Sequence, residues 1–472
     1  MKYKDLKKYT FVVVSALFLA SCEDMIEIDP PTNALSVDET YSSVEGIRTA
    51  ATGLYSGTIH ANAYYYQIPS IYYNWLADDM TYYRPQSYAD WIENSYTEKT
   101  SYVQTMWTQL YKQVFQDNDF IEHVKNTKLI DEEERNGYIG EALWMRSFDY
   151  FWLVNTWGDV PLVLSNNYAV SSVQGRNAVS EVYDQMIADL KTSIDYLKNA
   201  KSNTRITSDA SRALLSRCYL YTEQWQEAAD MASQLIPTTD GGKGTNYQLE
   251  TPEKVFLDTS KESIFAADMS GFSGSGTYEG YTREGVLFAP TSGYGVYILT
   301  DDLVEFLHRD TTDLRQCWIG EVNNKKGGSD FYPAKYKNYS DVTVKANGFK
   351  ENFIYLRLAE QYLIRAEAYA HLNKLDKALQ DLNAIRKRSG VAPYEGTYTQ
   401  QKVLDLVADE RRIELFAEQG HRFFDLKRTG RIDDVLSKCS WKKWKSEKAL
   451  LPIPYTEMEN NRNLTQNPGY NN

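Results

Sequence analysis

The chain has 472 residues with a net charge of −13 at pH 7, and 14% of its residues are aromatic, including 37 tyrosines. An acidic chain is not expected to bind nucleic acid or anionic lipid headgroups through its overall electrostatic field. Its length supports a large core and suggests about three domains. We therefore expect partners that are neutral, cationic or matched by shape.

The N-terminus has the parts of a secretory signal. Its positive region holds four lysines, Lys2, Lys4, Lys7 and Lys8. Residues 11–20 form an apolar segment that is too short to span a bilayer as a stable helix. Leu19, Ala20 and Ser21 then lead to Cys22, so a cysteine stands where the signal would be cut.

This end resembles the signal of bacterial lipoproteins, whose lipobox here reads Leu-Ala-Ser-Cys. The resemblance implies cleavage before Cys22 and a diacylglyceryl group on its thiol. An ordinary signal peptide followed by a chance cysteine is the alternative. Stable anchoring takes about two acyl chains, so we predict a protein that lies on a membrane without spanning it. Residues 1–21 carry four lysines and one aspartate, and cleavage would leave a mature charge of −13 − 3 = −16.

The other cysteines, Cys218, Cys317 and Cys439, are widely spaced. Three thiols at such spacing form neither a disulfide framework nor a zinc pattern. Cys218 stands in the apolar run 213–220, which predicts a buried small hydrophobic residue.

Along the chain, an acidic segment with Pro30 and Pro31 (residues 23–45) is typical of a tether. Apolar residues at helical spacing follow in residues 43–56, 107–124, 131–156, 179–198, 208–235, 352–372, 374–388 and 399–417. Two long segments, 64–100 and 237–302, lack this periodicity. Their aromatic content is too high for simple linkers, and loops of this length are usually functional or disordered.

Two of the helical segments, 213–230 and 363–380, are similar to each other. The aligned pairs are Tyr219 with Tyr369 and Ala228 with Ala378. Each segment predicts a helix, a turn and a second helix, in which a small residue lets the aromatic residue of the first helix pack closely. This spacing resembles a tetratricopeptide unit. Chance similarity between two helical hairpins is the alternative.

Several stretches, taken in order, resemble a known family. They read GEALWMR at 140–146, WGDVP at 157–161, LRLAE at 356–360, ERRIEL at 410–415, EQGHRFFDLKR at 418–428, LLPIP at 450–454 and NLTQNPGY at 463–470. Together with the lipobox, they closely resemble the SusD/RagB family of outer-membrane nutrient-binding lipoproteins, over nearly the whole mature chain.

The resemblance implies a mostly α fold, with a scaffold of about four tetratricopeptide-like hairpins and an irregular, loop-rich second part. It also implies a binding protein and no enzyme: a surface-exposed lid that passes a glycan, or in some members a peptide, to a SusC-like TonB-dependent transporter. Glu23 and Asp24 resemble the residues that direct such lipoproteins to the cell exterior. We divide the chain into a signal peptide (1–21), a tether (22–45), an N-terminal helical part (46–236) and a loop-rich C-terminal part (237–472).

The stretch around 410–428 is rich in charge. Glu410, Arg411, Arg412, Glu414 and Glu418 have spacings suited to ion pairs within one helix. His421, Arg422, Asp425 and Lys427 follow, mixed with phenylalanines. Such a cluster is consistent with catalysis, but we favour a structural network that ties one hairpin to the next.

Signals of catalysis or of a cofactor are weak. The five histidines never form a His-x-x-x-His pair, and Ser273 lacks the last glycine of a nucleophile elbow. The glycine-rich stretches around 241–244 and 274–276 fail the phosphate-loop and dinucleotide patterns. Asp78/Asp79 and Asp301/Asp302 are acidic pairs, but adjacency does not give the separation that a glycosidase needs. We predict no catalytic residue, cofactor or metal site, with a hydrolase as the rival hypothesis.

The two long segments hold the better evidence for a ligand site. A sugar ring presents an apolar C–H face and a polar rim, so aromatic plates mixed with Asp, Asn and Arg suit it. The alternative is that these rings pack the loops onto the scaffold, and a scaffold that only docks partners is a further hypothesis. The predicted ligand-binding residues are Tyr82, Tyr83, Arg84, Tyr88 and Trp91 in the first segment, and Tyr278, Tyr281 and Tyr294 in the second.

Overall fold

The computed structural model describes residues 37–58, 68–237, 246–269, 272–274, 276–291, 295–324 and 327–471. The predicted signal, Cys22 and much of the tether lie outside these residues. The chain divides into two compact units, residues 1–50 and 51–472. In the first, the described part contains α2 (Val37–Tyr41) and the start of α3 (Val44–Thr58). The predicted boundary at 236/237 stays a prediction.

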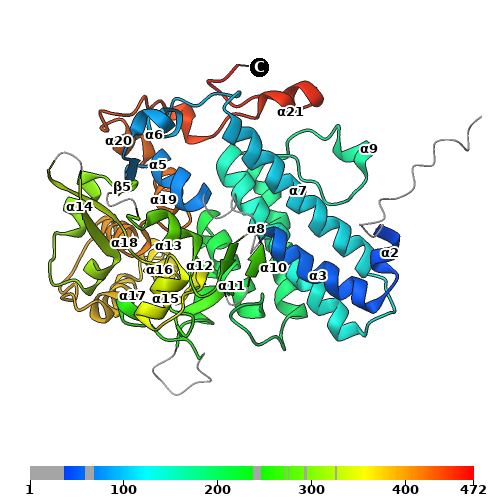
Figure 1. Ribbon diagram of the computed structural model, residues 1–472, viewed down its shortest axis with the longest axis horizontal. Helices are drawn as coiled ribbons and strands as arrows, with labels where there is room; N and C mark the ends of the chain where they lie inside the picture. The colour runs from blue at the N-terminus through cyan, green and yellow to red at the C-terminus, as the bar shows by residue number, and fades with distance from the viewer. Residues whose placement is uncertain are drawn as a thin grey trace, which may run out of the picture. The chain divides into compact units, whose positions relative to one another are not determined.

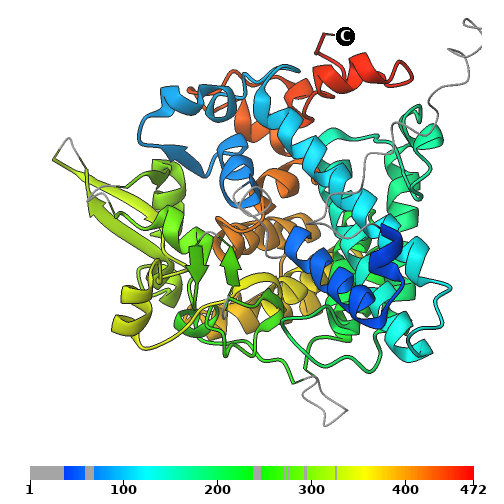
Figure 2. The same cartoon turned by 45° about the vertical axis from the view of Figure 1, so that its right-hand side comes forward.

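Three long helices lead the second unit: α7 (Ser101–Val124), α8 (Glu132–Trp157) and α10 (Val179–Tyr196). The α8 helix packs against both of the others, and α7 and α8 lie side by side in Figures 1 and 2. Asp131 caps α8 by accepting a hydrogen bond from the Glu134 backbone N–H at 2.9 Å, and acidic residues fill the first turn. From Ile139 onward every residue of α8 is buried, because helices surround it.

The two similar segments are both helical hairpins, as predicted. They are α11 (Ser208–Tyr221) with α12 (Trp225–Ser233), and α16 (Leu358–His371) with α17 (Leu375–Arg388). Their turns place aligned residues, Glu223 and Asn373, at φ of 58° and 56°. Ala228 and Ala378, each on the second helix of its hairpin, are both fully buried. The mostly helical fold is confirmed, and so is the burial of Cys218.

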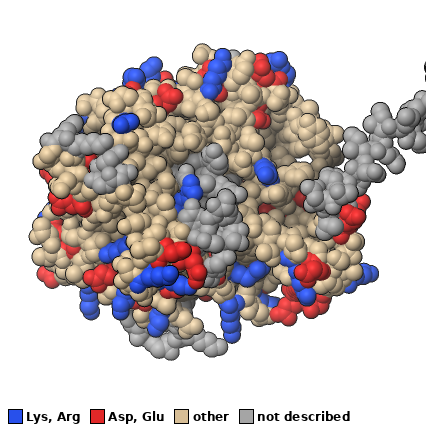
Figure 3. Space-filling model, in the orientation of Figure 1, with Lys and Arg blue, Asp and Glu red and all other residues tan. Residues whose placement is uncertain are grey.

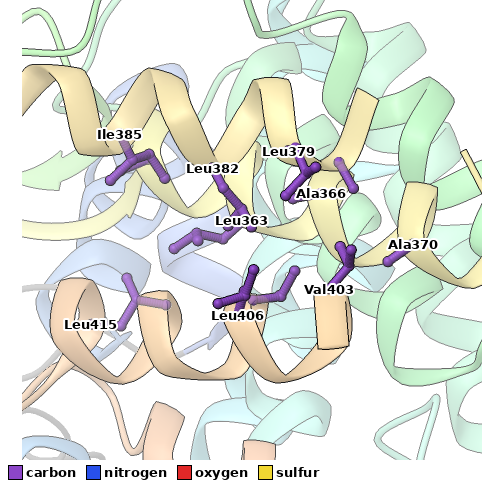
Figure 4. Packing of buried hydrophobic residues seen from close by; sticks show 12 residues of the cluster. Leu363, Ala366, Ala370, Leu379, Leu382, Ile385, Val403, Leu406 and Leu415 are labelled. Carbon is purple, nitrogen blue, oxygen red and sulfur yellow. The ribbon is translucent and has the colours of Figure 1, made fainter. Parts of the chain in front are cut away.

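One core cluster joins α16 and α17 to α18 (Gln400–Leu415). Figure 4 shows Leu363, Leu382 and Leu406, one from each helix, pointing toward one another. Burying one leucine side chain stabilises the fold by about 1.5–3 kcal/mol. This shared cluster therefore holds α16, α17 and α18 together.

The prediction of one helix over 352–372 was wrong at its start. Residues 353–357 form strand β8 (Phe353–Arg357), which pairs antiparallel with β2 (Ser263–Ala267). Both strands are buried on both faces, and Phe, Ile and Tyr favour such a position. A continuous apolar run does not distinguish a buried strand from a buried helix by periodicity.

Short elements lie between the long helices and in the C-terminal region. The other strands pair antiparallel as β1 (Met80–Tyr82) with β5 (Tyr297–Leu299), β3 (Phe272–Gly274) with β4 (Gly276–Tyr278), and β6 (Ile319–Asn323) with β7 (Ser329–Pro333). The remaining helices are α5 (Tyr73–Leu76), α6 (Ala89–Ile92), α9 (Tyr168–Ser171), α13 (Arg283–Phe288), α14 (Asp301–Leu307), α15 (Asp341–Asn347), α19 (His421–Arg428), α20 (Ile432–Leu436) and α21 (Tyr455–Asn460). Single π or 3-10 turns are η1 (Ile68–Tyr72), η2 (Pro85–Tyr88), η3 (Pro252–Lys254), η4 (Leu314–Trp318) and η5 (Ser446–Ala449). Among the described residues, no helix is both long and apolar enough to cross a bilayer.

The N-terminal and C-terminal parts of the second unit are interleaved. The α5 helix packs against α19, and Figures 1 and 2 show these blue and orange segments side by side. The Trp157 indole donates to the Pro452 carbonyl at 2.9 Å, and the Asn467 side chain donates to the carbonyl of Trp157 at 2.9 Å. The C-terminal turn segment is therefore fastened to the end of α8.

Candidate aromatic binding site

Strand pairing brings the two aromatic segments together. In the β1–β5 register Tyr82 lies opposite Tyr297, and the Tyr83 backbone N–H donates to the Val296 carbonyl at 3.1 Å. The Thr300 hydroxyl, which caps α14, donates to the Asp78 carbonyl at 2.6 Å. Residues more than 200 positions apart thus share one surface.

The rings at this junction form what we call the aromatic platform: Trp75, Tyr82, Tyr83, Tyr88 and Tyr297. The Tyr82 centroid lies 4.8 Å from those of Tyr83 and Tyr88, and 5.5 Å from that of Tyr297. Trp75 is only 1% exposed and supports the rings from beneath, with Tyr88 at 4.8 Å and Tyr297 at 5.9 Å. The four tyrosines are half-buried, so each fixed ring keeps part of its surface in solvent.

Polar groups border these rings. Residues 84–87 are exposed, and the Arg84 guanidinium carbon lies 5.0 Å from the Tyr83 ring centroid. Partial burial and neighbouring tyrosines raise the pKa of Tyr82, and burial raises that of Tyr88. Both phenols therefore stay protonated at neutral pH and are able to donate and accept hydrogen bonds. The platform combines flat apolar faces with hydroxyl and guanidinium groups.

The other predicted ligand residues are placed differently. Trp91 is buried, at 2% exposed, with its ring edge-on to Tyr72 at 4.8 Å, so it has no free face for a ligand. Tyr281 is half-buried beside Thr282, the N-cap of α13, and Phe288 of that helix contacts Tyr297 at 5.9 Å. Tyr294 and the side chain of Tyr278 lie outside the described residues, as does Cys22, the predicted lipidation residue.

The sequence did not single out Tyr297 or Tyr102. Tyr297 was one aromatic among several in its segment, and only strand pairing shows that it meets Tyr82. Tyr102 lies in the first turn of α7, which begins before the predicted start at residue 107, and its ring is 4.8 Å from that of Tyr72.

An ion cluster holds the platform onto the scaffold. Arg422 makes two hydrogen bonds of 2.8 Å to Asp78, and Arg412 contacts Asp79 at 2.8 Å and Asp302 at 2.9 Å. Burial alone would raise the pKa of Asp78, but its bond to Arg422 and the charge of Arg412 lower it to about 2. Burial raises the pKa of Asp79. Because Asp78 and Asp79 both pair with arginines, their role is to position the platform on the scaffold.

A second cluster is centred on Glu414. It accepts from Arg357 at 2.6 Å, from Arg315 at 2.9 Å and from Arg388. Burial alone would raise the pKa of Glu414, but the three guanidinium charges hold it well below its ordinary value. The predicted structural network is confirmed, whereas the predicted ion pairs within one helix were wrong. Among the described residues, the ion pairs of residues 410–418 all reach other segments, because this side of α18 is buried.

These features define a helical scaffold that carries a partly exposed aromatic surface. A family model described as "SusD family" matches residues 309–470, and one described as "Starch-binding associating with outer membrane" matches residues 30–220. The chain belongs to the SusD/RagB family, as the sequence predicted.

Relatives align over nearly the full chain. SusD-like protein P38 of Formosa agariphila is 22% identical and covers 99% of this chain and 100% of its own. The crystal structure of a SusD superfamily protein from Bacteroides vulgatus has a TM-score of 0.76 at 22% identity, covering 90% of this chain and 99% of that one. A laminarin-binding SusD-like protein has a TM-score of 0.74 at 22% identity, with coverages of 91% and 100%.

Proposed function

We propose that this protein captures a glycan on the aromatic platform and delivers it to a SusC-like TonB-dependent transporter. The observation that carries the proposal is the β1–β5 pairing, which unites two aromatic segments into one supported surface. Fixed rings bind the C–H faces of sugars at low entropic cost, and the flanking hydroxyl and guanidinium groups suit sugar hydroxyls. The contacting residues in this proposal are Tyr82, Tyr83, Arg84 and Tyr88, joined by Tyr278, Tyr281 and Tyr294, while the buried Trp91 packs against Tyr72.

Two further observations favour a neutral ligand. On the face shown in Figure 3, basic and acidic side chains are interspersed rather than separated by sign. One structural relative is a laminarin-binding SusD-like protein, and one matched family model is described as starch-binding. Both laminarin and starch are neutral glucans, so a polysaccharide panel should begin with these two.

Removing the half-buried ring of Tyr83 tests the platform. We expect Tyr83→Ala to weaken polysaccharide binding about tenfold, because one aromatic contact and the Arg84 contact are lost together. Affinity electrophoresis against laminarin, starch and other polysaccharides measures the change. Tyr168→Ala is the matched control, since Tyr168 is 80% exposed on α9, apart from the platform, and its loss should change nothing.

Binding and hydrolysis are separable. The proposal is a binding protein whose Asp78 and Asp79 position loops, so purified protein should release no reducing sugar from any bound polysaccharide. If the wild type releases reducing sugar and an Asp79→Asn variant does not, the protein is a hydrolase and this proposal is wrong.

The membrane anchor gives a separate prediction. We propose that Cys22 carries the lipid that holds the protein on the outer membrane, facing the cell exterior. Cys22→Ala should move the protein from the outer-membrane fraction to the soluble fraction, because about two acyl chains supply stable anchoring. Immunoblots of both fractions measure the shift, with Cys317→Ala as control. A mutant that still pellets with the outer membrane would contradict the anchor.

The transporter partnership is tested by co-purification. A tagged wild-type protein should retain a TonB-dependent transporter from detergent-solubilised outer membranes. Retention of the transporter by a protein that binds no glycan would favour the alternative, a peptide-binding or purely structural partner.

A further inference from the structure

The side chain of Lys442 reaches the base of the aromatic platform from the segment that follows α20. Its Nζ donates to the carbonyl of Trp75 at 2.8 Å, to the carbonyl of Ile92 at 3.0 Å and to the side-chain oxygen of Asn94 at 2.8 Å. An ammonium group has three N–H donors, so all three are used here. The acceptors all belong to the first aromatic segment, and Ile92 is 350 residues away from Lys442 in the sequence.

These bonds connect the two short helices beneath the platform. Trp75 lies in α5 and Ile92 ends α6, and each helix has four residues, too few to be stable alone. Carbonyls near a helix C-terminus lack partners within the helix, and a positive charge is favourable there. Tyr88 directly precedes α6, and its ring lies 4.8 Å from that of Trp75. By joining the backbones of α5 and α6, Lys442 sets where Tyr88 lies relative to Trp75.

Neighbouring contacts fix the same place. Asn94 is fully buried, and its amide nitrogen donates to the carbonyl of Leu76 at 3.1 Å while its oxygen accepts from Lys442. The backbone N–H of Lys443 donates to the carbonyl of Glu93 at 2.6 Å. The chain around Lys442 is therefore bound to residues 92–94, which holds its ammonium group under the platform.

The ammonium group of Lys442 is bound by neutral oxygen atoms, and it forms no ion pair with a carboxylate among the described residues. Burial lowers the pKa of Lys442 to about 7, although Cys439 and Asp78 act in the opposite direction. The pKa of Asp78 is about 2 and burial raises that of Cys439, so neither changes its charge near pH 7. The charged and titratable groups around Lys442 are Asp78, Glu93, Arg412, Arg422, Cys439 and Lys443.

The charge of Lys442 does not serve the stability of the fold. An unfolded lysine keeps its proton up to about pH 10.4, so a lowered pKa means that folding favours the neutral amine above about pH 7. The neutral amine has two N–H groups and a lone pair, and it leaves one of the three oxygen atoms without a donor. Only the charged form satisfies all three, and a buried group with such a shifted pKa is typical of functional sites.

We propose that Lys442 is a positioning residue for the glycan site, whose charged ammonium group holds α5 and α6 where the platform presents Tyr82 and Tyr88 to the ligand. This inference rests on the proposed function. Lys442 itself touches no glycan. As the pH rises through neutrality, Lys442 loses its proton, the two helices are held less firmly and the affinity for the glycan falls.

Calorimetric titration of a bound polysaccharide into the wild type and Lys442→Met tests this, because methionine is similar in length but carries no charge. We expect the wild type to bind about tenfold more tightly than the variant at about pH 6, and about twofold or less at about pH 8.5. The ratio of the two affinities cancels the other titrating groups, and a merely structural contact would give one ratio at both pH values. Lys438→Met is the control, since Lys438 is exposed on the same segment and should bind like the wild type.

The remaining outcomes separate this inference from the proposed function. A ratio near one at pH 6, or a ratio that does not fall by pH 8.5, overturns the role of Lys442 and leaves the proposed function standing. If the wild type binds no polysaccharide at either pH, the proposed function fails and this inference fails with it. If circular dichroism shows that Lys442→Met is unfolded, Lys442→Arg decides. Arginine stays charged at both pH values, so the affinity of this variant should fall less than that of the wild type, and an equal fall overturns the proposal.

Discussion

Replacing Glu414 by alanine should lower the free energy of unfolding by about 3–5 kcal/mol, because removing one partner of a buried ion cluster leaves uncompensated charge. Glu414 is fully buried against Arg315, Arg357 and Arg388. The variant would keep three guanidinium groups in the interior with one carboxylate fewer. Since these arginines come from η4, β8 and the end of α17, the loss should loosen several segments together.

Chemical denaturation followed by circular dichroism measures this change. Glu227→Ala on α12 is the matched control, because Glu227 is exposed and such substitutions usually stay within about 0.5 kcal/mol. A loss below about 1 kcal/mol in Glu414→Ala would show that the cluster does not hold the fold in this way.

Glu284→Gln should change how stability depends on pH. Glu284 is 1% exposed in α13, where Ser70 donates to it at 3.2 Å, and burial raises its pKa to about 8. The folded state therefore keeps a proton that the unfolded chain loses above about pH 4.3. The contribution of Glu284 to the free energy of unfolding is fully present below that pH. It falls by about 1.4 kcal/mol per pH unit as the pH rises toward 8.

The glutamine variant lacks this titration. Between pH 5 and 7.5 the wild type should lose about 3 kcal/mol relative to Glu284→Gln, while groups common to both proteins cancel. Urea denaturation at both pH values tests this, with Glu227→Gln as an exposed control. Parallel pH profiles for the wild type and Glu284→Gln would contradict a protonated Glu284.

Helices and hairpins were predictable because their signals are local. Apolar spacing located α8 and α10 to within two residues at each end, and the similarity of 213–230 to 363–380 predicted two hairpins. Strand β8 was missed since its partner β2 is about 90 residues away in sequence, and a buried apolar run gives no period. The true partners of Glu410 and Glu414 were missed for the same reason, because they lie on other segments.

The candidate site follows from the sequence by region but not by residue. Composition pointed to the two aromatic segments, and the structure pairs Tyr82 with Tyr297 across them. Composition does not distinguish a ring that faces solvent from one that packs inward, so Trp91 was predicted as a ligand contact although it is buried. Exposure depends on tertiary packing, which no single segment encodes.

Calorimetric titration of a bound polysaccharide into the wild type and the Tyr83→Ala/Tyr88→Ala variant tests the central claim most directly. The account predicts a measurable affinity for the wild type, and a loss of about 100-fold or more in the variant at an unchanged melting temperature. Equal affinity of the folded double variant and the wild type would contradict a glycan site on the aromatic platform.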